Sequence, residues 1–218
     1  MMPEINKPVR IAVNVMRARL TIIGFNVAIV SFQIVQLNNL SGGIRVPGIN
    51  HGVHIGADIA LFMALALSFL AMIAFLVSSS FDEVGVCNHW SFVAGDLLMY
   101  LGLAHTASGF FAPLGMAIAA FVAKLPNYAT EIFILHGAVL LVGGMAWFFA
   151  IYVGPLVSLL RSPFSRPINI TLGIAYLSLL LGLCWISSQA TLIEVAGSGE
   201  KAGAVVRTLI ELVQPFRW

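Results

Sequence analysis

The sequence predicts an all-α, polytopic helical membrane bundle of about five transmembrane helices, with an amphipathic surface helix at the carboxyl end. Two observations predict this fold class. Apolar residues make up 60% of the 218 residues and charged residues only 9%, whereas soluble domains carry about 25% charged residues. The apolar residues form continuous runs, not the alternating pattern of barrel strands. This composition excludes an ordinary soluble enzyme, a disordered chain and a nucleic-acid-binding protein.

Five apolar segments are long enough to cross a bilayer, because a spanning helix needs roughly 20 residues. They run over residues 20–37, 54–78, 92–112, 128–153 and 168–190. The residues between them are rich in Gly, Pro and charged side chains, as expected of turns. Residues 114–125, between Pro113 and Pro126, allow two interpretations. They either extend the third helix past a proline kink or fold back as a re-entrant or interfacial piece.

We expect one integral membrane domain over residues 1–218. It comprises a basic leader of residues 1–19, the transmembrane bundle of residues 20–190 and an amphipathic tail of residues 191–218. Lys and Arg gather in the leader and in the loop between the fourth and fifth spans, which five spans place on the same side. Because positively charged loops favour the cytoplasm, we expect the amino terminus there.

The tail carries apolar residues at helical spacing, which predicts a helix that lies on the membrane surface or against a partner. These residues are Val205, Val206, Leu209, Ile210 and Val213. The expected surroundings of the whole chain are the lipid bilayer, with either further copies of the chain in a homo-oligomer or partner membrane subunits.

Small residues predict where the helices approach one another, because lipid gives apolar helices little other reason to associate. In the second span Gly56, Ala60 and Ala64 recur every four residues. In the third span the spacing is seven residues, and the seam consists of Gly95, Gly102 and Gly109. We expect these two stripes to be helix-packing faces.

Ionisable residues at membrane depth are the candidate functional residues, because they are costly there and usually face a cavity or a partner. The candidates for an ion or proton pathway are Asp58, His105, Glu131 and His136. If the third span ends at residue 112 and the fourth begins at residue 128, His105 lies roughly 10 Å deep and His136 about 12 Å deep from the same face. The sequence therefore predicts that these residues cluster near one membrane face.

The same residues allow two cofactor interpretations. His54 and Asp58, one helical turn apart, together with His105 and His136 supply nitrogen and oxygen ligands for a metal ion. The two histidines of the third and fourth spans also suit the axial positions of a b-type haem. Gly102 and Gly109 would leave room for the flat ring beside His105. The sequence favours neither the haem nor the metal.

Three functions therefore stay open. The first is a small ion or proton channel or transporter that uses the polar cluster. The second is a non-catalytic subunit of a larger membrane complex. The third is an electron carrier with a single b-type haem. No phosphate-binding loop, nucleophile elbow or intramembrane lysine is visible, so a non-enzymatic function is the favoured interpretation.

Overall fold

The computed structural model describes residues 9–10, 13–37, 44–45, 52–81, 86–87, 89–195 and 203–218. Within these ranges five helices are long and apolar enough to cross a membrane. A shorter helical segment follows near the carboxyl end. The predicted fold class, a multi-pass helical bundle with a carboxyl-terminal helix, is therefore confirmed. Residues 1–8 and 11–12 of the expected leader and residues 196–202 of the expected tail lie outside the described residues.

Four of the spans are single helices: α1 (Val13–Leu37), α2 (Ile55–Phe81), α3 (Ser91–Lys124) and α6 (Arg166–Val195). The other span joins α4 (Ala129–Phe148), a π-helical turn η2 (Phe149–Val153) and α5 (Gly154–Leu160). A 3-10 turn, η1 (Pro126–Tyr128), connects α3 to α4, and the tail forms α7 (Ala204–Ile210) and the 3-10 segment η3 (Glu211–Arg217). Two-residue strands pair antiparallel, β1 (Val9–Arg10) with β4 (Val86–Cys87) and β2 (Ile44–Arg45) with β3 (Gly52–Val53).

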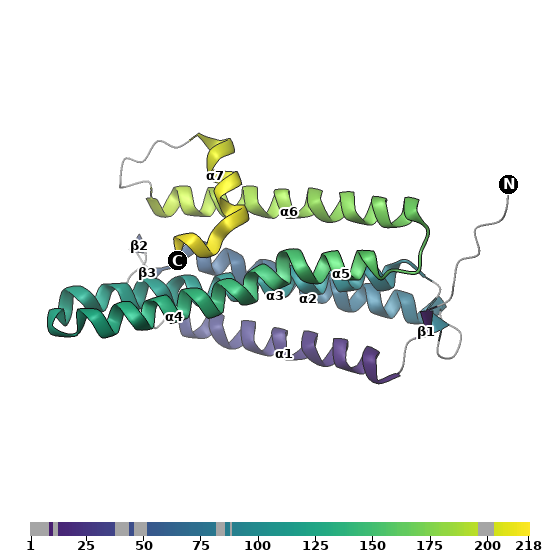
Figure 1. The fold of residues 1–218 in the computed structure, drawn as a ribbon, viewed down its shortest axis with the longest axis horizontal. Coiled ribbons are helices and arrows are strands. Elements are labelled where there is room, and N and C mark those ends of the chain that lie inside the picture. Colours follow the sequence, from purple (N-terminus) through teal and green to yellow (C-terminus); the bar gives the residue numbers. More distant parts are fainter. Residues whose placement is uncertain are drawn as a thin grey trace.

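Helix α3 runs through Pro113 without a break, so residues 114–125 extend the third helix and the expected end at residue 112 is wrong. A proline is tolerated in a membrane helix when neighbouring helices pack around it, and Pro113 is buried. The 34 residues of α3 span about 51 Å, which exceeds a hydrocarbon core of about 30 Å. The hairpin of α3 and α4 accordingly projects beyond the ends of α1 and α6 (Figure 1). We call this end of the bundle the hairpin end.

The seam of small residues on α3 lies against α2. Gly95 faces the ring of Phe75, and Gly102 faces Ser68 and the carbonyl of Ala64. A Cβ placed on Gly109 would lie 2.6 Å from the side chain of Leu61. No larger residue fits this spacing without displacement, so the glycines determine how closely α2 and α3 approach.

The stripe of small residues on α2 serves two neighbours. Ala64 is fully buried at the seam with α3. Ala60 is also buried, but Gly56, at the start of the helix, faces the carboxylate of Glu194 on α6. Figure 1 shows α1 and α6 on opposite sides of the α2 and α3 pair. The stripe therefore packs on α3 at Ala64 and on α6 at Gly56, near the hairpin end.

A polar network joins α1, α2 and α3 near the middle of the bundle. The Asn26 amide donates to the Ser68 hydroxyl at 2.9 Å, and the Thr106 hydroxyl donates to the Asn26 carbonyl oxygen at 2.7 Å. All three side chains are buried. Because hydrocarbon offers no hydrogen-bond partner, these bonds favour one arrangement of the three helices.

An ion pair links α1 to α3 at the end opposite the hairpin. The Arg19 guanidinium donates two hydrogen bonds to the Asp96 carboxylate and lies 4.4 Å from the centre of the Phe92 ring. Asp96 is buried, and this partner explains how a carboxylate is accommodated there. The pair holds the first turns of α3 against α1, and both Asp96 oxygens are occupied by Arg19.

The seam can be tested with two glycine substitutions in detergent-solubilised protein. We expect Gly109→Ala to lower the free energy of unfolding by about 1–3 kcal/mol, because Leu61 and the helices must shift to accept the methyl group. Gly24→Ala is the matched control, since a Cβ at this exposed position of α1 meets nothing within 4 Å. Thermal unfolding measures both. Equal stability of the two variants would show that the seam does not limit the α2–α3 distance.

Candidate functional site

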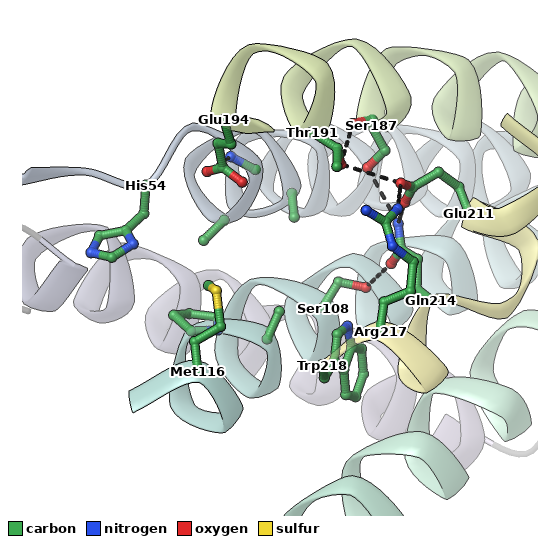
Figure 2. A pocket seen from close by; sticks show the side chains of 15 residues that line it. His54, Ser108, Met116, Ser187, Thr191, Glu194, Glu211, Gln214, Arg217 and Trp218 are labelled. Atoms are coloured by element: carbon green, nitrogen blue, oxygen red, sulfur yellow. Dashed lines mark hydrogen bonds and ion pairs between the residues drawn. The ribbon is translucent and has the colours of Figure 1, made fainter. Parts of the chain in front are cut away.

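A polar cavity of about 210 Å³ lies between α2, α3, α6 and the tail, near the hairpin end (Figure 2). Its walls mix apolar residues with charged and hydrogen-bonding side chains. The polar residues of the lining are His54, Ser108, Ser187, Thr191, Glu194, Glu211, Gln214 and Arg217. Such a concentration of polar groups inside a membrane-spanning bundle marks the candidate functional site.

Glu194 reaches the cavity from the last turn of α6. The backbone N–H of Gly56 donates to its Oε1 at 2.7 Å. The carboxylate thus sits at the start of α2, where the helix dipole supplies about half a positive charge. Among the described residues, this is the one hydrogen bond that Glu194 accepts, and neither described ion pair involves it. No described cationic side chain therefore compensates its negative charge, and the helix dipole does so only in part.

Glu211, in the tail, is in contrast fully occupied. It forms an ion pair with Arg217, accepts from the Thr191 hydroxyl at 3.2 Å and accepts from the Gln214 amide at 2.6 Å. Only 3% of Glu211 is exposed. Because each carboxylate oxygen already has a donor, Glu211 acts as an anchor between the tail and α6.

Gln214 continues this network across the cavity. Its side-chain oxygen accepts from the Ser108 hydroxyl of α3, and its amide also donates to the Ser187 hydroxyl of α6 at 3.3 Å. Figure 2 shows these bonds joining the tail to the helices on both sides. The tail is therefore part of the cavity wall and connects α3 to α6.

The apolar side of the tail faces outward. Val205, Leu209 and Phe216 are exposed, the last at 89%. The Tyr152 hydroxyl donates to the backbone carbonyl of Leu212 at 2.6 Å and holds the segment against η2. The tail is amphipathic as predicted, because its polar side chains close the cavity and its apolar side chains face the surroundings of the bundle. Figure 1 shows the tail lying beside α6.

The predicted pathway residues do not form one cluster. His54 lines the cavity together with Gly56 and Ala60, and its Nε2 has no partner among the described residues. Asp58 is half-buried and lies outside the cavity lining. Glu131 is exposed in the first turn of α4, close to the tip of the hairpin.

His105 and His136 lie far apart, so the expectation of equal depth is wrong. In the fourth span, Gly143 packs against Phe111 of α3 and Gly154 packs against Tyr100. In this antiparallel pairing, the residue of the fourth span at the same level as His105 is close to position 149. His136 is thirteen residues away from that position, about 20 Å along the axis. Its Nε2 lies 3.6 Å from the Cβ position of Gly115 instead. The expectation assumes that the third span ends at residue 112. Because α3 continues to Lys124, His105 lies twelve residues deeper from the hairpin tip than this assumption gives.

This geometry also removes the basis of the cofactor interpretations. Two histidines separated by about 20 Å along the bundle cannot both ligate one haem iron. The face of α3 beside His105 is filled by Ser68 at Gly102 and by Leu61 at Gly109, which leaves no space for a flat ring. Within the described ranges, no group of three or more His, Cys, Asp or Glu residues is placed to hold a metal ion.

Sequence reasoning missed most of the cavity residues, although two patterns point to them. Ser187, Thr191 and Glu194 recur at steps of four and three, which places them on one face of α6. Glu211, Gln214 and Arg217 recur at steps of three in the tail. The first pattern extends beyond residue 190, the expected end of the fifth span. The second is interleaved with the apolar residues that predict the amphipathic tail.

Comparison of the chain with protein-family profiles, with curated proteins and with solved structures gave no match. The function must therefore be argued from the chemistry of the cavity. Its lining offers two carboxylates, one guanidinium, an imidazole and several hydroxyl and amide groups. Carboxylates and neutral imidazoles bind protons and metal cations, whereas the guanidinium is already paired with Glu211.

The anchoring role of Glu211 predicts a loss of stability when its charge is removed. We expect Glu211→Gln to lower the free energy of unfolding by about 1–3 kcal/mol, because Arg217 and Gln214 lose a charged acceptor in a buried site. Glu131→Gln is the matched control, since the same chemical change occurs at an exposed position. Thermal unfolding in detergent measures both variants. A Glu211→Gln protein as stable as Glu131→Gln would contradict the anchor.

Proposed function

We propose that this multi-pass membrane protein transports protons or another small cation, and that the cation binds in the cavity between α2, α3, α6 and the tail. The observation that carries the proposal is Glu194. Its carboxylate lies in the wall of an intramembrane cavity, and none of the described Lys or Arg side chains pairs with it. Glu194 is half-buried, and a carboxylate that is partly removed from water without a cationic partner is costly. A bound cation or proton lowers that cost.

The charge and size of the cavity support a small cation. Arg217 compensates Glu211, so Glu194 leaves the lining with a net negative charge when His54 is neutral. The volume of about 210 Å³ is smaller than pockets for drug-sized ligands, which begin near 300 Å³. Since a water molecule takes about 30 Å³ of liquid volume, an ion with several waters fits this space.

The packing beneath the cavity supports a carrier more than an open pore. Leu61 and Ala64 of α2 and Leu101 and Ala104 of α3 are fully buried between the cavity and the opposite end. A cation that crosses this layer requires either movement of the helices or a relay of protons through polar groups. The cavity is then the binding chamber at one face.

Positive charge supports a cytoplasmic amino terminus. Arg17, Arg19, Arg161 and Arg166 all lie at the end opposite the hairpin, at the first turns of α1 and between α5 and α6. Short loops rich in Lys and Arg stay on the cytoplasmic side. We therefore infer that the hairpin end and the cavity lie on the other side of the membrane.

Purified protein in liposomes tests the transport proposal. We expect wild-type protein to carry protons, measured with a trapped pH-sensitive dye, or sodium or potassium, measured with ion-sensitive dyes. Glu194→Gln should reduce that flux at least tenfold, equivalent to about 1.4 kcal/mol of lost stabilisation, because the amide binds neither a proton nor a cation strongly.

The control for this experiment is Glu131→Gln, which removes a carboxylate outside the cavity and should leave flux unchanged. Thermal unfolding of both variants separates a transport defect from a folding defect. The proposal is overturned if wild-type liposomes pass none of these ions, or if Glu194→Gln transports as fast as the wild type.

Cysteine labelling tests the orientation. With Cys87 and Cys184 replaced by Ala, single cysteines are introduced as Asn127→Cys at the hairpin tip and Ser162→Cys at the opposite end. We expect a membrane-impermeant maleimide to label Asn127→Cys in intact cells and Ser162→Cys only after permeabilisation. The reverse pattern would show that the amino terminus lies outside.

A further inference from the structure

His105 is a buried histidine whose ring has no partner. Only 4% of the residue is exposed, and neither Nδ1 nor Nε2 forms a hydrogen bond within the described part of the chain. A neutral imidazole has one donor and one acceptor. Leaving a buried polar group unpaired costs free energy, so His105 destabilises the bundle unless water or a proton reaches it.

The position of His105 connects it to the cavity. His105, Ser108 and Ala112 are separated by three and four residues and so share one face of α3. Ser108 and Ala112 line the cavity. His105 therefore lies one turn below the cavity floor, about 4.5 Å further along the axis toward the opposite end.

Hydrogen-bonding groups flank His105 on its own helix. Ser108, one turn above, is bonded to Gln214 of the cavity network. Thr106, the next residue, is bonded to Asn26 of the network between α1 and α2. His105 thus lies beside the polar network and one turn below the cavity, in the layer that also contains the buried side chains of Leu101 and Ala104.

The charged groups around this layer are engaged elsewhere or lie in the cavity. The tail contributes Glu211 and Arg217, which pair with each other, and α6 contributes Glu194 at the start of α2. Asp96 of α3 pairs with Arg19 of α1 at the opposite end. Asp58 lies on α2 and His54 just before it. Neither ring nitrogen of His105 is hydrogen-bonded to any of these groups.

We propose that the transported cation is a proton and that His105 receives it below the cavity floor. This inference rests on the function proposed above. The neutral ring takes a proton from a hydronium ion in the cavity water, so an O–H bond breaks, an N–H bond forms, and water and the imidazolium are left. The ring becomes neutral again when that proton passes to another water or returns to the cavity. An unpaired ring nitrogen is available for this transfer, whereas an alkali cation gains nothing from an imidazole in an apolar layer.

Replacement of the His105 imidazole tests the proposal, because it should keep or raise the stability of the protein and lower its proton flux. We expect His105→Phe to be at least as stable as the wild type, since an apolar ring replaces an unsatisfied polar one. Its proton flux in liposomes should fall at least tenfold. The control is His89→Phe, which changes a histidine beside Ser91 at the opposite end and should leave flux unchanged.

Three outcomes decide between this inference and the transport proposal. If Glu194→Gln abolishes flux while His105→Phe transports normally, His105 is a structural residue and only this inference fails. If neither variant changes proton flux, both proposals fail. If wild-type liposomes pass sodium or potassium but no protons, this inference is overturned and the transport proposal stands.

A measurement on the wild-type protein remains informative if His105→Phe does not fold. Nitrogen NMR of ¹⁵N-histidine-labelled protein in lipid bilayers reports the protonation of each ring and its contact with water. We expect the His105 resonances to receive magnetisation from water and to change between neutral and acidic pH. A ring that stays neutral and dry across this range would rule out the proposed role.

Discussion

Hydrocarbon cannot form hydrogen bonds, and this constraint governs how the bundle treats each polar group. The Asn26 network, the Arg19–Asp96 pair and the Tyr176 hydroxyl, which donates to the carbonyl of Ile151 in the π-helical turn, all satisfy it within the protein. Among the buried side-chain atoms that lack a hydrogen-bond partner in the described part of the chain, those of His54 and His105 lie at the cavity and directly below it. An unpaired polar group at such depth lowers the stability of the fold, so its presence there indicates a function.

The close approach of α2 and α3 determines where the cavity forms. Their glycine seam ends at Gly109, level with Leu61 near the start of α2. Helix α3 continues for 15 residues past this point along the hairpin, whereas α2 has only residues 55–60 beyond Leu61. The space beside residues 112–116 of α3 is therefore free to be lined by α6 and the tail. A proline in α3 at this level does not interrupt the helix, because the surrounding elements bury it.

The tail contacts the polar cavity on one side and the apolar surroundings of the bundle on the other. Its polar side chains satisfy one another and the cavity wall, while its apolar side chains cover the outside. This arrangement makes Glu211 and Glu194 chemically different despite their common cavity. Glu211 has donors on both oxygens and holds the wall together, whereas Glu194 retains capacity to bind. The distinction depends on partners and not on residue type.

The sequence by itself determined the membrane character, the five spans and the amphipathic tail, because these follow from local composition and from helical periodicity. It also placed small residues at Gly95, Gly102 and Gly109, whose spacing alone indicates a shared face. The relative depth of His105 and His136 was not accessible in this way, since it depends on where α3 ends and on the pairing of the hairpin. The partners of Asp96 and Glu194 lie 77 and 138 positions away along the chain, and those of Glu211 come from α6 and from the folded tail. Only the tertiary structure decided them, because such contacts depend on how whole helices pack and leave no periodic signal in the chain.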